Sequence, residues 1–585
     1  MSTPVESSPV PLPASPDIPD EERADLAQRI DALTAGASAW TALRLTARAA
    51  LLERVRDAVG AAAEEWAATA AASKGLGPAD PLRGEEWLAG PYAVLGALDG
   101  YIATLRRLAR GGSPLDGVRV DAAPGGRIRA HVFPATPADA VLLSGFTGEV
   151  WLRPGTDAAE AARTAGLAQL SPDSPGGVAL VLGAGNVTSI PVLDVLYELL
   201  AANRVVLLKV NPTQDTLVPV FERALAPLID AGFLRIVRGA GEVGAFLTRH
   251  PAFAHVHITG SAATFDAIVW GTEADAAARR AAGEPALPTP ITAELGGVSP
   301  IIVVPGPWTD ADLRFQAEHI ATMRLQNSGH NCIAGQVVIL SRDWPQREAF
   351  LTALRTAYRE APERPVWYPH AAERMRSAEA AYPDAAHLAH DTRLLVEVTP
   401  ADDPHPLETT EYFAPVLGIV ELAGGGHEFL DAAIAHANER LTGTLGANIL
   451  IDPVTERALG TDLDRAVADL RYGGIAINAW TGVLFATPIL PWGAFPGGTL
   501  AQVGSGIGVV HNTLLLDAVE RSVLRGPFRP FPRSLTGGSR FSILPKPPWF
   551  VSARTGAAVS EGLTRHRIDH RPTGLLATLV RALGA

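Results

Sequence analysis

The chain of 585 residues contains a single cysteine, Cys332. A single thiol cannot form an internal disulfide, so the sequence excludes a disulfide-stabilised scaffold and fits a reducing cytoplasm. Long hydrophobic runs are missing as well. No stretch of about 18 uncharged apolar residues occurs, which argues against a transmembrane helix. The sequence therefore predicts a cytoplasmic protein without an integral membrane segment.

The chain also has fewer basic residues than acidic residues. The chain has 49 Lys and Arg against 62 Asp and Glu, which gives a formal net charge of -13. This balance disfavours nucleic acid or an anionic membrane as the main partner. No repeat of solenoid length is visible. The hydrophobic content of 47% is that of a globular protein, and the length suggests two to four domains.

The two ends of the chain differ from its centre. Residues 1–20 are rich in proline and serine and predict a disordered arm. Residues 529–585 carry nine Lys and Arg against two Asp and Glu, and within them 573–583 form a short amphipathic helix candidate. We expect this helix to pack on its own subunit or on a neighbour. Membrane association is the less favoured alternative, since the helix is too short to span a bilayer.

The middle of the chain alternates between strand and helix patterns. Residues 178–182 form a short apolar run, residues 192–200 show helical spacing, and residues 203–209 form a second apolar run. Such a strand-helix-strand unit is the building block of parallel sheets. A second unit covers residues 233–258. The alternation resumes after Cys332, with a helix expected near 347–360 and strands near 394–398 and 415–421. The pattern predicts two successive α/β domains.

Cys332 lies in a turn-rich loop, residues 327–335, that contains two glycines and several polar side chains. A free cysteine is most often a small buried hydrophobe, but these neighbours and the apolar run that follows favour a catalytic thiol. Glu294 precedes Cys332 by 38 residues and is followed by Gly296 and Gly297. An isolated glutamate at a strand end would simply reach solvent. Together with the unique thiol, it forms a candidate pair of general base and nucleophile.

Asn186 lies in the turn between the first apolar run and its helix. The preceding residues, Gly183 and Gly185, give only a weak dinucleotide-binding signal, because the third glycine would fall at Thr188. The simple interpretation is a tight turn. Ligands of parallel sheets bind beyond the carboxyl ends of the strands, so the Asn186 amide is also a candidate donor to a developing oxyanion.

Taken together and in this order, the motifs resemble those of the aldehyde dehydrogenase superfamily, from about Trp40 to Pro530. The matching segments are Gly185-Asn186, Leu207-Leu-Lys209-Val-Asn-Pro212, Ile258-Thr-Gly260-Ser261, Glu294-Leu-Gly-Gly297, Asn327-Ser-Gly-His-Asn-Cys332, Glu411-Tyr-Phe413-Ala-Pro415-Val416 and Ala433-Ile-Ala-His-Ala-Asn438. The resemblance implies two three-layer α/β domains, a Rossmann-like cofactor domain at 21–293 and a catalytic domain at 294–500. A small strand-based oligomerisation element with a tail would follow at 501–585.

The resemblance also implies roles for individual residues. Cys332 would be the nucleophile, Glu294 the base that activates water, and Asn186 an oxyanion donor. The implied product is a carboxylic acid, formed with NAD or NADP and without a metal. The aldehyde would be a small molecule, apolar if Trp480, Phe485 and Trp492 shape its entrance, and the protein a homodimer or homotetramer. The residues implied in cofactor binding are Lys209, Thr259, Gly260, Ser261, Leu295, Glu411 and Phe413.

Several positions depart from the family pattern. His330 replaces a glutamine, Gly185 a tryptophan, Val298 a lysine and Phe265 a glycine. The segment after Lys209 also lacks the usual acidic residue for the adenine ribose. Asn211 or Gln214 is expected to take its place, and NADP stays open as the cofactor.

Three other functions remain open. A CoA-acylating aldehyde dehydrogenase, or acyl-CoA reductase, would pass the thioester to CoA, but such enzymes usually lack the glutamate base. A cysteine-dependent hydrolase would use His330, two residues from Cys332, as its base. The third alternative is a member of the family without catalytic activity.

Overall fold

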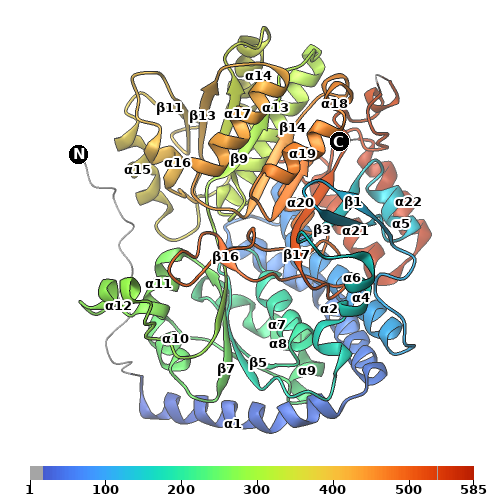
Figure 1. Ribbon diagram of the computed structural model, residues 1–585, viewed down its shortest axis with the longest axis vertical. Helices are drawn as coiled ribbons and strands as arrows, with labels where there is room; N and C mark the ends of the chain where they lie inside the picture. Colours follow the sequence, from blue (N-terminus) through green and yellow to red (C-terminus); the bar gives the residue numbers. More distant parts are fainter. Residues whose placement is uncertain (1–17, 537, 585) are drawn as a thin grey trace.

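Two β-sheets form the framework of the protein (Figure 1). The structure is a computed structural model, and it describes residues 18–536 and 538–584. Most of the arm expected at 1–20 lies outside the described residues. The first helix, α1, begins at Asp20.

The smaller sheet has the strand order β16-β8-β7-β4-β5-β6, and its strands are parallel except for β16. Every residue of β4 and β5 is buried, as expected for parallel strands that are covered on both faces. Its strands are β4 (Val178–Leu182), β5 (Val205–Lys209), β6 (Leu234–Val237), β7 (Phe253–Gly260), β8 (Ile291–Leu295) and β16 (Gly506–Ile507). The helices between them are α7 (Ile190–Ala201), α8 (Val218–Ala224), α9 (Ala226–Asp230), α10 (Gly241–Thr248), α11 (Ala262–Trp270) and α12 (Ala276–Ala282).

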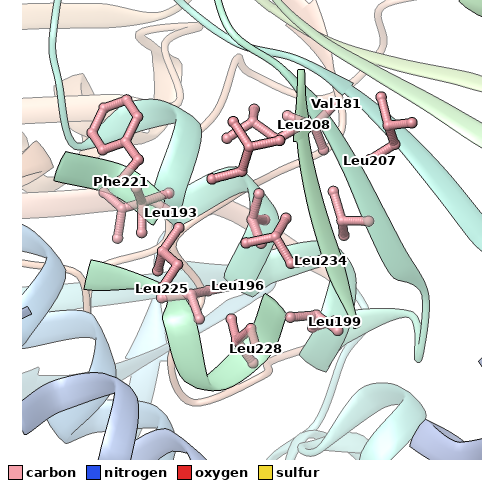
Figure 2. Close-up of a cluster of buried hydrophobic side chains, with 14 of the residues drawn as sticks. Val181, Leu193, Leu196, Leu199, Leu207, Leu208, Phe221, Leu225, Leu228 and Leu234 are labelled. Atoms are coloured by element: carbon pink, nitrogen blue, oxygen red, sulfur yellow. The ribbon is translucent and has the colours of Figure 1, made fainter. Parts of the chain in front are cut away.

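Figure 2 shows the core between this sheet and its helices. Leu193, Leu196 and Leu199 recur along α7 at helical spacing and pack with Leu207 and Leu208 of β5 in one buried cluster. Burying one such side chain contributes about 1.5–3 kcal/mol. This packing holds the helix against the sheet and so fixes the turn that contains Asn186.

The larger sheet has the order β1-β2-β3-β17-β15-β14-β9-β10-β13-β12-β11. Its centre, from β17 to β12, is parallel, while the strands at both edges are antiparallel. The strands are β1 (Arg119–Ala123), β2 (Arg127–Phe133), β3 (Thr147–Leu152), β9 (Ser299–Val303), β10 (Gly335–Ser341), β11 (Ala386–Leu388), β12 (Arg393–Glu397), β13 (Val416–Leu422), β14 (Gly446–Leu450), β15 (Gly474–Ile477) and β17 (Val519–Arg525).

The helices of the larger sheet alternate with its strands along the chain. Thr309 caps α13 in a capping box with Asp312, which fixes where the helix that leads to the Cys332 loop begins. The helices are α13 (Asp310–Leu325), α14 (Arg347–Glu360), α15 (Ala371–Ala381), α16 (His405–Thr409), α17 (Gly426–Glu439), α18 (Pro453–Leu459), α19 (Thr461–Asp469) and α20 (Thr481–Phe485).

The remaining helices come from the two ends of the chain. In Figure 1, α5, α21 and α22 lie together beside the first strands of the larger sheet, and α1 crosses the far side of the smaller sheet. α21 packs against α3, and α22 packs against α21. These helices are α1 (Asp20–Ala42), α2 (Leu45–Ser73), α3 (Gly84–Trp87), α4 (Ala93–Leu108), α5 (Pro137–Leu142), α6 (Ala158–Thr164), α21 (Gly556–Asp569) and α22 (Pro572–Ala582). In the described residues, no helix is both long and apolar enough to cross a membrane.

The structure confirms the two-sheet α/β fold. The sheets do not use consecutive segments of chain, however. β1, β2 and β3 fall within the range 21–293 but extend the larger sheet through the antiparallel pair of β3 and β17. β16 falls within 501–585 but pairs with β8 in the smaller sheet. An apolar alternation pattern shows that a strand exists, and it does not show which sheet the strand joins.

Candidate active site

The parallel strands of the smaller sheet end together at one edge. The last residues of β4 and β5 are paired, Leu182 with Lys209, and Leu182 is also opposite Ile258 on β7. Thr259 is in turn opposite Glu294 on β8. Chain segments that follow parallel strands line the crevice where ligands of α/β sheets bind. The edge thus brings together the turns that contain Asn186, Lys209, Gly260 and Leu295.

The loop that contains Cys332 connects α13 to β10 and rests on this edge. Asn327 and Ser328 both have φ of 54°, a left-handed conformation that costs free energy in residues other than glycine. Polar contacts hold it in place. The Asn327 side-chain amide donates to the carbonyl of Asn186 at 3.1 Å, and its backbone N–H donates to Glu85 Oε2 at 2.9 Å.

Cys332 and Asn186 line the same cavity, whose volume is about 710 Å³. Asn186 Nδ2 donates to the carbonyl of His330 at 2.9 Å. The Asn186 side-chain amide is therefore held against the backbone of His330, which precedes Cys332 by two residues in the chain. A substrate oxygen that accepts a hydrogen bond from Asn186 Nδ2 has to compete with the His330 carbonyl for this donor.

The Cys332 thiol is protonated in this environment. Burial of the thiolate, followed by the negative charges of Glu294 and Glu411, raises the pKa of Cys332 well above its ordinary value. Both carboxylates are therefore within electrostatic range of the sulfur. Positive charge brought to this site would favour the thiolate, which is the reactive form.

Glu294 is buried at the end of β8. The Trp492 indole N–H donates to its Oε1, and within the described residues its Oε2 has no hydrogen-bond partner. Burial and the nearby charge of Asp194 raise the pKa of Glu294 to about 8. Its side chain does not line the cavity, so it has to turn away from Trp492 to reach a water molecule beside Cys332.

A buried polar cluster lies behind Glu294. Asp194 Oδ2 accepts a hydrogen bond from Thr259 Oγ1 at 3.0 Å and lies 3.6 Å from His257 Nε2. The Thr292 hydroxyl is 2.9 Å from ring nitrogens of both His255 and His257. These residues come from α7, β7 and β8. This cluster could not be predicted from the sequence, because its members are single polar residues inside apolar segments.

Lys209 lies at the end of β5, where burial lowers its pKa to about 8. Two carboxylates near Lys209, those of Asp215 and Glu242, partly oppose this effect. The two side chains that were expected to stand in for an acidic residue are engaged inside the protein. Asn211 accepts from Thr213, and Gln214 donates to a backbone carbonyl at 3.3 Å. Within the described chain, Asp215 Oδ1 has no hydrogen-bond partner.

In the turn after β7, mainly the backbone is available to contact a ligand, because the side chains of Thr259 and Ser261 are engaged inside the protein. The Ser261 hydroxyl accepts from the N–H of Thr264 at 3.1 Å and so caps α11, and the Thr259 hydroxyl is directed to Asp194. Gly260 is exposed and free of a side chain. This makes the Gly260 segment, at a helix N-terminus, suited to a phosphate.

Glu411 and Phe413 lie on the segment that precedes β13. The Glu411 carboxylate rests on Gly296, where a Cβ atom would come within 2.0 Å of Oε1, which explains the glycine after Leu295. Burial raises the pKa of Glu411 to about 7. Among the described residues, its Oε1 has no hydrogen-bond partner. Phe413 packs edge-on against Tyr368, with ring centroids 5.0 Å apart.

His330 is fully buried and both of its ring nitrogens are occupied. Nδ1 is 2.7 Å from the carbonyl of Phe413, and Nε2 accepts from the N–H of Tyr368 at 3.4 Å. Burial lowers the pKa of His330 to about 3. This histidine holds the loop in place, and no nitrogen is left to take a proton from Cys332.

The other departures from the family pattern have structural causes. A Cβ atom at Gly185 would lie 2.6 Å from Thr213 Oγ1, so no larger residue fits there. Val298 and Phe265 are fully buried core residues. Trp480 and Phe485 line the cavity, whereas Trp492 is committed to Glu294. Among the described residues no group of three or more His, Cys, Asp or Glu could hold a metal.

Sequence comparison finds similarity to proteins that are named aldehyde dehydrogenases. The model of the aldehyde dehydrogenase family matches residues 155–364. The 4,4'-diaponeurosporen-aldehyde dehydrogenase of Staphylococcus aureus is 25% identical over 360 residues, which are 59% of this chain and 70% of the relative. Betaine aldehyde dehydrogenase 2 of Rhizobium meliloti is 38% identical over 123 residues, 21% of this chain and 22% of that relative.

Solved structures share the fold at lower identity. An NAD-dependent aldehyde dehydrogenase from Sinorhizobium meliloti matches with a TM-score of 0.56 at 20% identity, over 85% of this chain and 86% of the other. An NADP-dependent glyceraldehyde-3-phosphate dehydrogenase from Bacillus halodurans matches with a TM-score of 0.55 at 18% identity, over 86% and 91%. These matches show that the fold of this chain is shared with those proteins.

Proposed function

The chain belongs to the aldehyde dehydrogenase superfamily, and we propose that it oxidises an aldehyde to a carboxylic acid through a thioester on Cys332. One observation carries the proposal. Cys332 and Asn186 share the wall of one cavity at the carboxyl edge of the smaller sheet, and the Glu294 carboxyl is buried within electrostatic range of the thiol. This arrangement supports Cys332 as the nucleophile, Asn186 as the oxyanion donor and Glu294 as a base that reaches the thiol by rotation.

The residues support a two-stage reaction. The Cys332 sulfur attacks the aldehyde carbon, and its proton passes to solvent. The Asn186 amide and the backbone N–H of Cys332 donate to the oxyanion that forms. When bound, the nicotinamide supplies a positive charge and the acceptor for the hydride that leaves this carbon. The carbon, now oxidised, stays bound to sulfur as a thioester.

Glu294 performs the second stage. Its ionised carboxylate takes a proton from water, the resulting hydroxide adds to the thioester carbon, and the Cys332 thiolate leaves as the acid is released. Two features suit Glu294 to this role. Its pKa of about 8 makes the carboxylate a stronger base than an ordinary glutamate, and rotation away from Trp492 would bring it toward the thiol.

The same edge supports NAD as the cofactor rather than NADP. Glu411 Oε1 is a buried acceptor without a partner in the described structure, as a ribose hydroxyl requires. Asp215 and Glu242 lie near Lys209, and Asp215 Oδ1 is also unpaired there. Carboxylates at this position accept from the 2′-hydroxyl of NAD and repel the 2′-phosphate of NADP. Sequence reasoning missed both acidic residues because neither directly follows its strand: Asp215 lies six residues beyond Lys209, and Glu242 lies in the first turn of α10.

The alternatives are less well supported. Transfer of the acyl group to CoA needs no general base, and Glu294 would then have no role. Hydrolase chemistry with His330 fails because both of its ring nitrogens are bonded to backbone groups.

The experiment that tests the function compares the unmodified protein with Cys332→Ala and Glu294→Gln. With an aldehyde and NAD, the unmodified protein should release NADH and free acid at a rate independent of CoA. Cys332→Ala should lose turnover but keep NAD binding, seen as thermal stabilisation by the cofactor. Glu294→Gln should give one burst of NADH per site and then turn over roughly 10²–10⁴-fold more slowly. Restoration of turnover in this variant by CoA would establish acyl-CoA formation instead.

The cofactor preference has its own test. Asp215→Asn should weaken the discrimination against NADP, measured as the ratio of kcat/KM for the two cofactors, because it removes charge and keeps the shape of the side chain. Asp343→Asn, far along the chain in the turn after β10, is the matched control. An unmodified enzyme that prefers NADP would contradict the proposal.

A further inference from the structure

The cavity that contains Cys332 extends far beyond the thiol. Its volume of about 710 Å³ is in the upper half of the range typical of ligand sites, roughly 300–1,000 Å³. Cys332 and Asn186 form one part of the wall, and Leu563 of α21 and Leu579 of α22 form another. The C-terminal segment 529–585, which contains α21 and α22, therefore closes the same cavity that holds the proposed nucleophile.

One face of α4 leaves room along this cavity. Gly96, Gly100 and Ala103 recur at spacings of four and three residues, so they lie on one side of the helix and all line the cavity. A Cβ atom on Gly96 would be 3.3 Å from Arg567 Nη1, which places α21 directly across from this face. From Gly96 to Arg107, the lining residues rise by about 16 Å along the helix axis.

Arg107 and Arg567, the two arginines of the wall, are both engaged by groups of the protein, Arg107 by backbone carbonyls. Arg567 donates to the Tyr92 hydroxyl at 3.2 Å and lies 3.6 Å from Asp99 Oδ2 and 3.9 Å from Asp139 Oδ1. Its guanidinium is already paired and does not offer a site for an anionic substrate. Beside Cys332 the polar groups of the wall are neutral amides, those of Gln326 and Asn331.

Resting on the proposed aldehyde oxidation, we infer that the substrate carries a long unbranched hydrocarbon chain, which lies along α4 under α21 and α22. An extended chain advances roughly 1.2 Å per bond, since an extended backbone covers about 3.5 Å in three bonds. The stretch beside α4 therefore accommodates about fourteen carbon atoms. A wall that is apolar along most of its length, and whose Arg107 and Arg567 already donate to groups of the protein, suits such a chain and disfavours short or ionic aldehydes.

The first test measures kcat/KM of the unmodified protein for linear aldehydes from propanal to octadecanal. The value should rise up to roughly fourfold for each added methylene and level off near tetradecanal. A flat profile, with short aldehydes turned over as well as long ones, would overturn the inference and leave the proposed function standing. Failure to oxidise any of them would instead contradict the proposed function.

A second readout does not depend on turnover. Cys332 is the only thiol, so its alkylation by iodoacetamide reports access to one end of the cavity. 1-Dodecanol should slow alkylation at least tenfold at concentrations where 1-propanol has no effect. Equal protection by the two alcohols, or none by either, would refute a long-chain site even in a protein that oxidises no aldehyde.

Two alanines on α22 provide matched variants. Ala582 lines the cavity and Ala577 is exposed on the outer side of the same helix. Ala582→Trp should lower the ratio of kcat/KM for dodecanal to kcat/KM for propanal at least tenfold, while Ala577→Trp should leave this ratio unchanged. If Ala582→Trp keeps the full preference for dodecanal, α22 does not contact the chain, and its assignment as part of the site is wrong.

Discussion

The Glu294 carboxyl determines how the proposed reaction depends on pH. Burial and Asp194 hold its pKa at about 8, so at pH 7 most molecules carry the protonated form, which cannot act as a base. We expect the rate of thioester hydrolysis to rise through a midpoint near pH 8 and then level off. Single-turnover release of acid, measured from pH 6 to 10, gives this midpoint.

Asp194→Asn should move that midpoint to lower pH. The substitution removes a negative charge, and an ionised Glu294 then becomes easier to form. The other groups that face Glu294 stay in place, namely His257 and the Trp492 indole. Hydrolysis at pH 7 should accelerate several-fold, while the rate at pH 10 should fall slightly, because a carboxylate of lower pKa is a weaker base. Asp343→Asn serves as the control, and an unshifted midpoint would show that Asp194 does not act on the base.

At the scale of elements, the turn after β8 positions the proposed ribose-binding carboxylate. Gly296→Ala should displace Glu411, because the new Cβ would overlap its Oε1. We expect the KM for NAD to rise at least tenfold with a small change in kcat. Gly244→Ala on α10, where the added Cβ meets no atom within 4 Å, is the matched control. A normal KM in Gly296→Ala would remove Glu411 from the cofactor site.

Many elements could be predicted from the sequence. The helix expected at 347–360 is α14, and the apolar runs at 178–182 and 203–209 are β4 and β5. Short apolar runs of this kind are unambiguous when glycine turns and helical spacing flank them. The pairing of β3 with β17 and the covering of the cavity by α22 were not predictable in the same way. Both depend on contacts between segments hundreds of residues apart.

The residues of the candidate site also divide into those that local sequence motifs reveal and those that only the folded structure brings together. Cys332, Glu294, Asn186 and Lys209 belong to local motifs, and their proposed roles could be stated before the fold was known. Asp194, His257 and Asp215 contribute through space alone, from elements whose sequence only shows a helix, a strand or a turn. The direction of Trp492, toward the base and away from the cavity, also required the packed structure.

At the scale of the whole molecule, buried ion pairs connect the N-terminal helices to the Cys332 loop. Lys74 Nζ lies 2.8 Å from Glu86 Oε1, with both side chains at most 3% exposed. The adjacent Glu85 pairs with Arg364 and accepts the backbone N–H of Asn327. Through these contacts, α2 and α3 support the loop of the proposed nucleophile.

Lys74→Met should therefore destabilise the protein strongly, because it leaves the Glu86 carboxylate buried without its partner. We expect a loss of about 3–5 kcal/mol in the free energy of unfolding, measured by urea denaturation. Arg106→Met, which breaks the solvent-exposed pair with Glu53, should cost less than about 1 kcal/mol. Similar losses in the two variants would mean that burial does not set the strength of these pairs.

The hydrogen bond from Trp492 to Glu294 gives the protein an optical reporter of its own proposed base. The fluorescence of an indole changes when the group that accepts its N–H gains or loses charge, and this acceptor titrates near pH 8. The chain has eleven tryptophans, so the signal of Trp492 is the difference between the emission of the unmodified protein and that of Trp492→Phe. Turning of Glu294 toward the thioester would break the same bond, and stopped-flow fluorescence would then follow the base as it moves.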